Sequence, residues 1–114
     1  MARAYVPDRG EIVWLQFNPR AGHEQAGRRP AFVVSPRAYN RKVGLALFCP
    51  VTSRPKGYPF EVPLPEGGKA QGVILSDQLK SLDWKKREAS RLDRVDEGVV
   101  AEVTARLLAL VDPE

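Results

Sequence analysis

Proline and glycine interrupt this chain so often that most of it cannot form long helices. Ten prolines and nine glycines occur in 114 residues, and short runs rich in Val, Ile, Phe, Tyr and Trp lie between them. Proline lacks a backbone donor and glycine weakens regular structure, so such runs are typical of short strands joined by turns. Six strands are predicted, at Glu11–Phe17, Ala31–Ser35, Leu45–Val51, Phe60–Leu64, Gly72–Asp77 and Ala89–Val95.

The last part of the chain follows a different pattern. Its apolar residues recur at helical spacing, at Val99, Val100, Val103, Leu107, Leu110 and Val111. Asp96 is a suitable N-cap, and Glu97 in the first turn is favoured by the helix dipole. We therefore predict a helix from about Glu97 to Leu110. The expected fold is mainly β, a strongly bent sheet or small barrel with a C-terminal helix, in one domain over residues 1–114.

Cysteine content and apolar run lengths indicate the compartment. Cys49 is the single cysteine and lies in an apolar run, which indicates a buried thiol in a reducing cytoplasm. The longest apolar runs, 45–49 and 107–111, have five residues each, whereas a membrane span needs about 20. The first ten residues have no apolar segment of the kind found in signal peptides. We expect a cytoplasmic protein that does not enter a membrane.

Basic residues are concentrated in the first half of the chain. Residues 1–56 contain 10 Lys and Arg against 3 Asp and Glu, a balance of +7. Residues 57–114 contain 8 Lys and Arg against 11 Asp and Glu, a balance of −3. An uneven distribution of this kind suggests a face that binds a polyanion such as nucleic acid, although a solvated surface would also account for it.

The residues present exclude several kinds of active site. His23 is the only histidine, so catalysis by a histidine pair is excluded, and its polar segment, 18–27, is expected to be a mobile loop. One histidine and one cysteine are too few for a structural zinc site, and no Walker-type phosphate loop occurs. The densest group of acidic residues, at 93–102, lies at the start of the C-terminal helix and is expected to be a solvated helix face rather than a converging cluster. We therefore expect no metal and no cofactor.

Five motifs follow one another in order along the chain. They are EQAGRRPAFVVS at 24–35, PVTS at 50–53, KGYPFEV at 56–62, GVILSDQ at 72–78 and KSLDW at 80–84. Together they resemble the MazF/PemK family of toxin–antitoxin endoribonucleases, from about Tyr5 to Trp84 and more loosely through the C-terminal helix. Several motifs in a consistent order are far more specific than any one alone.

This resemblance implies a fold and an activity. It implies an SH3-like, strongly bent antiparallel sheet with a helix, assembled as a homodimer. It also implies metal-free, sequence-specific cleavage of single-stranded RNA such as mRNA, and a cognate MazE-like antitoxin that blocks the RNA groove. Cleavage without a metal requires a base for the 2′-hydroxyl, an acid for the 5′-oxygen and a donor for the phosphoryl charge.

The resemblance assigns catalytic roles to Arg29 and Thr52. The Arg29 guanidinium suits a phosphate, and we expect it to stabilise charge; the alternative is a surface arginine paired with a carboxylate. The Thr52 hydroxyl would bond a phosphate oxygen, although the local sequence alone favours a turn threonine. Glu24 is the best candidate for the general base, with a solvated loop residue as the alternative. His23 matches no family motif.

Further residues are predicted to bind RNA. They are Gln25, Arg28, Ser53, Lys56, Asp77, Gln78, Lys80 and Trp84. Trp84 precedes a basic run and would stack on a base, but packing at a sheet edge is the favoured alternative. Asp77 and Gln78 either read base edges or cap a turn. Trp14 is expected in the core or in the dimer interface.

Two other functions fit the same fold. A CcdB-like, gyrase-binding toxin acts through a C-terminal tryptophan, but this chain has no tryptophan after Trp84. It also keeps Arg29 and Thr52, which such a toxin does not require. An SH3-like module that binds RNA without cleaving it is the third possibility. An RNA-cleavage assay in EDTA discriminates among the three.

Overall fold

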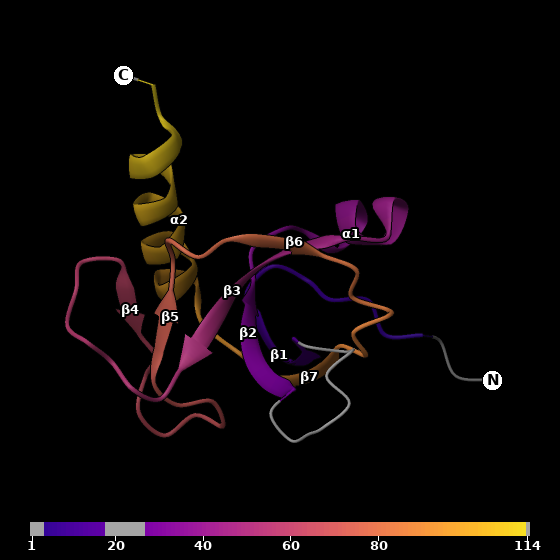
Figure 1. The fold of residues 1–114 in the computed structure, drawn as a ribbon, viewed down its shortest axis with the longest axis horizontal. Coiled ribbons are helices and arrows are strands. Elements are labelled where there is room, and N and C mark those ends of the chain that lie inside the picture. The colour runs from indigo at the N-terminus through magenta and orange to yellow at the C-terminus, as the bar shows by residue number, and fades with distance from the viewer. Residues whose placement is uncertain (1–3, 18–26, 114) are drawn as a thin grey trace.

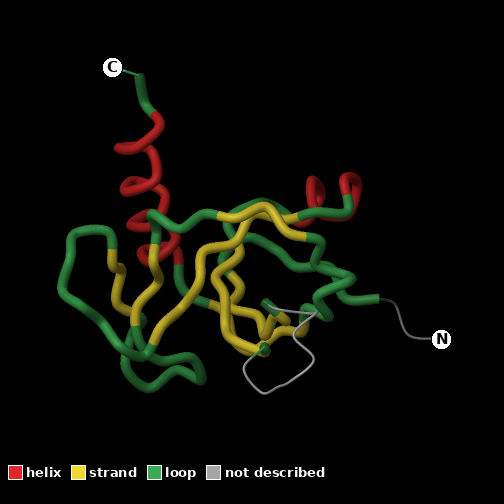
Figure 2. The backbone as a smooth tube through the Cα atoms, in the orientation of Figure 1, coloured by secondary structure: helices red, strands yellow, loops and turns green. Residues whose placement is uncertain are grey.

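The computed structural model describes residues 4–17 and 27–113, which form seven strands and two helices (Figure 1). In chain order these are β1 (Glu11–Gln16), β2 (Arg28–Val33), α1 (Arg37–Val43), β3 (Ala46–Thr52), β4 (Glu61–Pro63), β5 (Val73–Leu75), β6 (Lys80–Leu82), β7 (Ser90–Arg94) and α2 (Glu97–Val111). Figure 2 shows the strands as a central curved layer, with α2 beside β4 and β5 at one end and α1 at the other.

The strands form one antiparallel sheet with the order β4-β5-β3-β2-β1-β7. Strand β3 is central because it pairs with β6 near its start and with β5 near its end, while β2 lies along its other edge. The outer strands β4 and β7 do not pair within the described residues, so the sheet is strongly bent but open. Of the two predicted forms, the bent sheet is therefore confirmed and the closed barrel is not.

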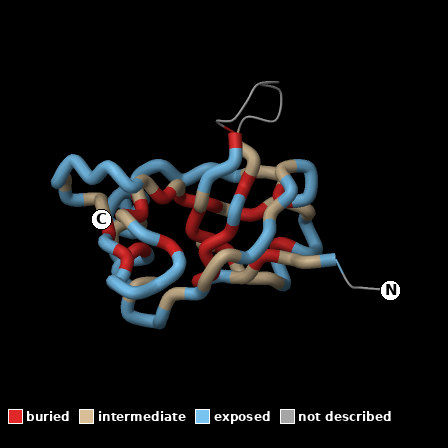
Figure 3. The backbone as a smooth tube through the Cα atoms, turned by 90° about the horizontal axis from the view of Figure 1, so that it is seen from below, coloured by how far each residue is buried: buried red, intermediate tan, exposed pale blue. Residues whose placement is uncertain are grey.

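Each face of the sheet is covered by its own hydrophobic core, because neighbouring strand residues point to opposite faces. Phe32 and Cys49 belong to one core, which also contains Val103 of α2. Ala31, Val33 and Phe48 belong to the other. The buried stretches run through the middle of the molecule, as Figure 3 shows. Burial raises the pKa of the Cys49 thiol to about 12, as expected for an unreactive core cysteine.

All six predicted strands and the predicted helix are present, with ends that differ by a few residues. The Asp96 carboxylate accepts the Val99 N–H at 3.1 Å, which confirms the N-cap. Two elements were not predicted. Helix α1 is seven residues long, too short for a clear apolar period, and is held by the buried Asn40 side chain, which donates to Pro7 O and Ser35 O. Strand β6 has three residues, of which only Leu82 is apolar.

Glu11 connects several elements to the start of the sheet. Its carboxylate is buried and accepts hydrogen bonds from the Tyr5 hydroxyl and, at 3.0 Å, from the Asp8 N–H. The guanidinium groups of Arg37, Arg91 and Arg94 lie 3.4 to 3.8 Å from the same carboxylate. This arrangement joins the N-terminal segment, α1 and β7 to β1. No helix in the described part of the chain is long and apolar enough to cross a membrane.

Candidate active site

Strands β2 and β3 separate at one end, and the separation creates a cleft. Their pairing runs Val33 with Phe48, Phe32 with Cys49 and Ala31 with Pro50, and stops there. Pro30 and Pro50 lie at this point, and neither has an N–H to continue the ladder. Beyond it, β3 pairs only along its opposite edge, with β5. The same register extended by two residues would place Arg29 opposite Thr52, so these two side chains lie at the two edges of the fork.

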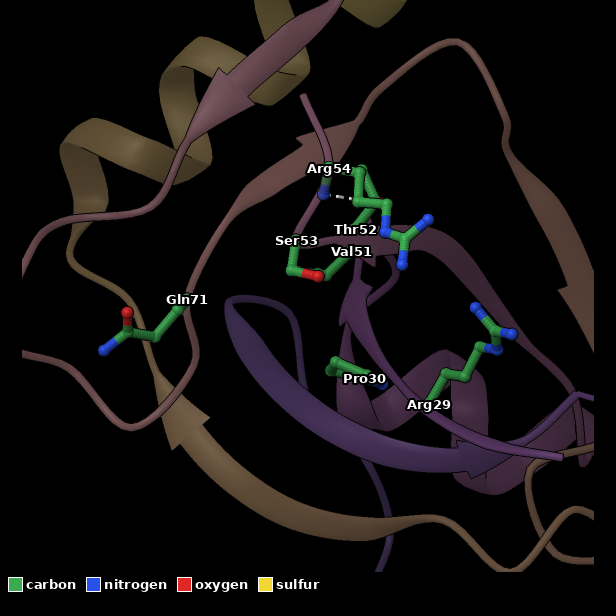
Figure 4. Close-up of a pocket in the computed structure, with 7 residues that line it drawn as sticks. All are labelled: Arg29, Pro30, Val51, Thr52, Ser53, Arg54 and Gln71. Carbon is green, nitrogen blue, oxygen red and sulfur yellow. Dashed lines mark hydrogen bonds between the residues drawn. The ribbon is translucent and has the colours of Figure 1, made fainter. Parts of the chain in front are cut away.

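The cleft at this fork has a volume of about 490 Å³. It is lined by Arg29, Pro30, Val51, Thr52, Ser53, Arg54 and Gln71 (Figure 4). None of these described lining residues is acidic, and two of them are arginines. A hollow with this lining attracts anions. Among the predicted residues, Arg29, Thr52 and Ser53 are therefore brought together.

A second hollow of about 260 Å³ adjoins the first, and Arg29, Val51 and Thr52 line both. Its remaining walls are apolar at Phe17, Pro50 and Leu75 and polar at Gln78 and Lys80. Apolar and aromatic walls with a few polar groups suit a flat ring that must also be oriented. The predicted residues Gln78 and Lys80 thus lie next to the Arg29–Thr52 pair.

Thr52 has a defined hydrogen-bond geometry. Its Oγ1 accepts the backbone N–H of Arg54 at 3.1 Å. A hydroxyl that accepts in this way still has its own hydrogen to donate. The structure therefore combines the two readings of Thr52 made from the sequence: the residue forms a local turn bond, and its O–H hydrogen remains available to a ligand in the cleft.

Asp77 lies close to the second hollow but does not line it. Its carboxylate accepts a hydrogen bond from the Tyr58 hydroxyl at 2.7 Å, and this bond raises the pKa of Tyr58. The bond links the loop after β3 to the end of β5, beside Gln78. Lys56 is exposed in the same loop, where its backbone N–H donates to Glu61 Oε2 at 2.7 Å. The structure places neither Asp77 nor Lys56 in the two hollows.

Two predicted RNA contacts point elsewhere. Arg28 precedes Arg29 on β2 and so faces the other side of the sheet, where its Nη2 donates to Ser90 Oγ at 2.8 Å. Trp84 is only 8% exposed, and its Nε1 donates to Asn40 O at 3.0 Å. A buried ring cannot stack on a base, so the predicted RNA contact of Trp84 is wrong and the packing alternative holds. Trp14 was expected in the core or the dimer interface; it is 37% exposed in the single chain, which excludes the core, and its place in a dimer interface stays a prediction.

Glu24, Gln25 and His23 lie outside the described residues, so their predicted roles remain predictions. Seven residues that line the hollows were not predicted as site residues. Four of them belong to the quoted motifs, and the other three, Phe17, Arg54 and Gln71, lie outside those motifs. Of these three, only Arg54 could have been suspected from the sequence, because it is a basic residue two positions after Thr52. No group of three or more His, Cys, Asp or Glu side chains that could hold a metal occurs within 4–17 and 27–113.

The chain is similar to several known proteins over nearly its whole length. Residues 8–111 match the family described as PemK-like, MazF-like toxin of type II toxin–antitoxin system. The chain is 44% identical over 111 residues to the endoribonuclease toxin MazF of Escherichia coli K12, covering 97% of this chain and 99% of that protein. It is also similar to MazF in the MazE–MazF complex of Deinococcus radiodurans, with a TM-score of 0.87, 49% identity and coverage of 97% and 100%. It also resembles MazF alone from the same organism, with a TM-score of 0.86 and 55% identity over 96% of this chain and 99% of that chain.

Proposed function

Because the chain belongs to the family of PemK-like and MazF-like toxins of type II toxin–antitoxin systems, we propose that the cleft at the fork of β2 and β3 is where it cleaves RNA. The chain is an endoribonuclease toxin that acts on single-stranded RNA and is neutralised by a cognate antitoxin of the MazE type. We infer that it acts in the cytoplasm, which fractionation of producing cells would check. The observation that carries the site assignment is the approach of Arg29 and Thr52 across a cleft whose described lining has no acidic residue.

The proposed reaction uses the nucleophile that RNA itself carries. The 2′-oxygen attacks the adjacent phosphorus, a bond forms between them, and the bond from phosphorus to the 5′-oxygen breaks. The proton lost by the 2′-hydroxyl is balanced by the proton gained by the 5′-oxygen. The products are a 2′,3′-cyclic phosphate and a 5′-hydroxyl. Since the nucleophile belongs to the substrate, the protein has to position the RNA, move protons and stabilise charge.

Arg29 and Thr52 supply the charge stabilisation in this proposal. The Arg29 guanidinium offers several donors in one plane to the phosphoryl oxygens. The Thr52 hydroxyl donates its hydrogen to the same phosphate while its oxygen accepts the Arg54 N–H. Ser53, Gln78 and Lys80 line the two hollows and contact the RNA on either side. Glu24 remains our proposed general base, and Gln25, Lys56 and Asp77 remain proposed contacts.

The alternative functions are less well supported. The relatives reported above are endoribonucleases, so a CcdB-like gyrase-binding toxin is not favoured. A module that binds RNA without cleaving it would not need a threonine and an arginine together in the wall of the cleft. Each alternative differs from the proposal in the products that it forms from RNA.

Incubation of the purified chain with a long single-stranded RNA in excess EDTA tests the proposed function. We expect cleavage at a short recurrent sequence, with 2′,3′-cyclic phosphate and 5′-hydroxyl ends, because the reaction relies on arginine cations rather than a metal. End-group analysis and mapping of the cleavage sites measure this. Cleavage that stops in EDTA and returns with Mg²⁺ would rule the mechanism out, and intact RNA under all conditions would rule out the activity.

We also propose that the homodimer forms through a groove beside α2. Two adjoining apolar hollows, of about 440 and 380 Å³, share Arg9 and Val34 and extend along α2 and towards α1. On the α2 side the groove is lined by Val100, Thr104, Leu107 and Leu108, and Leu108 is 54% exposed. A second copy would cover this apolar surface in a symmetric interface.

Leu108→Glu is expected to weaken the dimer at least a hundredfold. A symmetric interface loses two leucine side chains, at ~2 kcal/mol each. Sedimentation equilibrium measures the change as a shift from the mass of two chains towards the 12.7 kDa of one. Ala109→Glu is the matched control, since residue 109 is exposed on a side of α2 that points away from the groove. A Leu108→Glu chain that dimerises like the wild type would place the interface elsewhere.

A further inference from the structure

We propose that Arg54 is a second catalytic cation, which binds the scissile phosphate together with Arg29. This inference rests on the proposed function and extends it to a residue that neither the family motifs nor the local sequence identified. It concerns a side chain that lines the 490 Å³ cleft and is exposed to an incoming ligand. In this arrangement, the two arginines contact the reacting phosphate from opposite sides of the fork.

The two arginines come from different elements and reach the same space. Arg29 extends from β2, and Arg54 extends from the loop that follows β3. Figure 4 shows the Arg54 guanidinium beside Thr52 and the Arg29 guanidinium rising from β2 on that same side of the cleft. Gln71 lines the same cleft, but its amide points away from the two arginines. The positive charge is therefore concentrated on the Thr52 side.

Among the described residues, no charged side chain pairs with Arg54. Within 4–17 and 27–113, the Arg54 side chain makes no ion pair and no hydrogen bond, in contrast to Arg106, which bonds Glu102 at 2.6 Å. No acidic residue is among the described residues that line the cleft. Two cations that line one hollow repel each other, and an anion between them removes the repulsion. A phosphate has this charge, and it presents oxygens to both sides.

Arg54 is also positioned by the residue with which it would act. Its backbone N–H donates to Thr52 Oγ1 at 3.1 Å, so the start of the Arg54 side chain is fixed relative to the Thr52 hydroxyl. A ligand that accepts the Thr52 hydrogen therefore lies within the region that the Arg54 side chain borders. Lys56, two residues further on, lines neither hollow, so the loop directs only one cation into the cleft.

The role follows from the charge that develops during the reaction. As the 2′-oxygen bonds to phosphorus, the two non-bridging oxygens carry more negative charge than in the bound RNA. One guanidinium on each oxygen stabilises this state more than the ground state, which is the condition for an effect on rate. Arg54 takes up and releases no proton in this scheme, because an arginine stays charged throughout. Arg54 contributes a positive charge and oriented hydrogen-bond donors to the phosphate.

The test compares Arg54→Gln with the wild type under single-turnover conditions. The RNA is a short single-stranded oligonucleotide that the wild-type chain cuts once. Glutamine keeps a polar side chain and the backbone N–H to Thr52 but removes the charge. We expect the rate at saturating protein to fall about tenfold to a hundredfold, with little change in the protein concentration that gives half the maximal rate. Arg54→Lys, which keeps a point charge without the planar donors, should lie between the two.

Two controls make the result decisive. Arg41→Ala removes the same charge from an exposed site on α1 and should cleave at the wild-type rate. Thermal unfolding of the Arg54 variants should match the wild type, since the side chain is exposed. An unchanged maximal rate in Arg54→Gln, or a change confined to binding, would overturn the proposal. Wild-type chain that leaves RNA intact would instead overturn the proposed function, so the two failures are distinguishable.

Discussion

Arg29→Ala is expected to lower the rate of RNA cleavage a hundredfold or more while the chain stays folded. The substitution removes the cation that offsets charge on the phosphoryl oxygens, and loss of one such donor costs on the order of a hundredfold to a thousandfold. Stability should change little, because Arg29 is exposed at the end of β2, beyond the last β2–β3 pair. Cleavage of a single-site RNA, measured with circular dichroism on the same samples, provides the check.

Thr52→Ala and His23→Ala complete this experiment. Thr52→Ala removes both the hydrogen for the phosphate and the acceptor of the Arg54 N–H, so severe impairment is expected. His23→Ala should cost little, since His23 has no part in the proposed reaction. An Arg29→Ala chain with full activity on a matched RNA would contradict the assignment of the cleft. An inactive His23→Ala chain would show that the segment before Arg29 contributes a group that we have not assigned.

Local sequence patterns were sufficient to predict six of the seven strands in the described residues and the long helix. Proline and glycine mark the ends of the strands, and the apolar spacing after Asp96 is that of a helix with one buried side, where Val103 is fully buried. Helix α1 and strand β6 were missed because long-range contacts stabilise them. Asn40 joins α1 to Pro7, and β6 is defined by its pairing with β3. Such contacts leave no periodic signal in a short segment.

The candidate site was predictable only in part, for a different reason. Arg29 and Thr52 were predicted through the family motifs, and the structure adds that both line one cleft where β2 and β3 separate. Arg28 carries the same charge as Arg29, but strand alternation turns it to the opposite face. Trp84 lies next to basic residues, yet its ring completes a core. Residue type alone does not distinguish these cases, because the facing side depends on register and packing.

The cognate antitoxin is expected to displace RNA completely from the wild-type chain. The cleft contains the Arg29 and Arg54 guanidinium groups and no described acidic lining residue. A peptide segment rich in Asp and Glu is negatively charged, as an RNA backbone is. Such a segment can be disordered when free and become ordered when it binds. Because both ligands require the same cations, they should exclude each other. The binding of the antitoxin, like that of RNA, should weaken as salt rises, because salt screens the attraction between opposite charges.

Fluorescence anisotropy of a labelled RNA with a 2′-deoxy sugar at the cleavage site measures this competition, because that RNA binds but lacks the nucleophile. Titration with antitoxin should lower the anisotropy to that of free RNA, while light scattering shows the toxin dimer intact. Arg29→Ala should weaken the binding of both ligands, whereas Arg41→Ala, with the same loss of charge on α1, should weaken neither. RNA that stays bound in the saturated toxin–antitoxin complex would show that the antitoxin acts at another surface. Dissociation of the dimer on inhibition would point to the α2 groove, which lies apart from the residues that line the cleft.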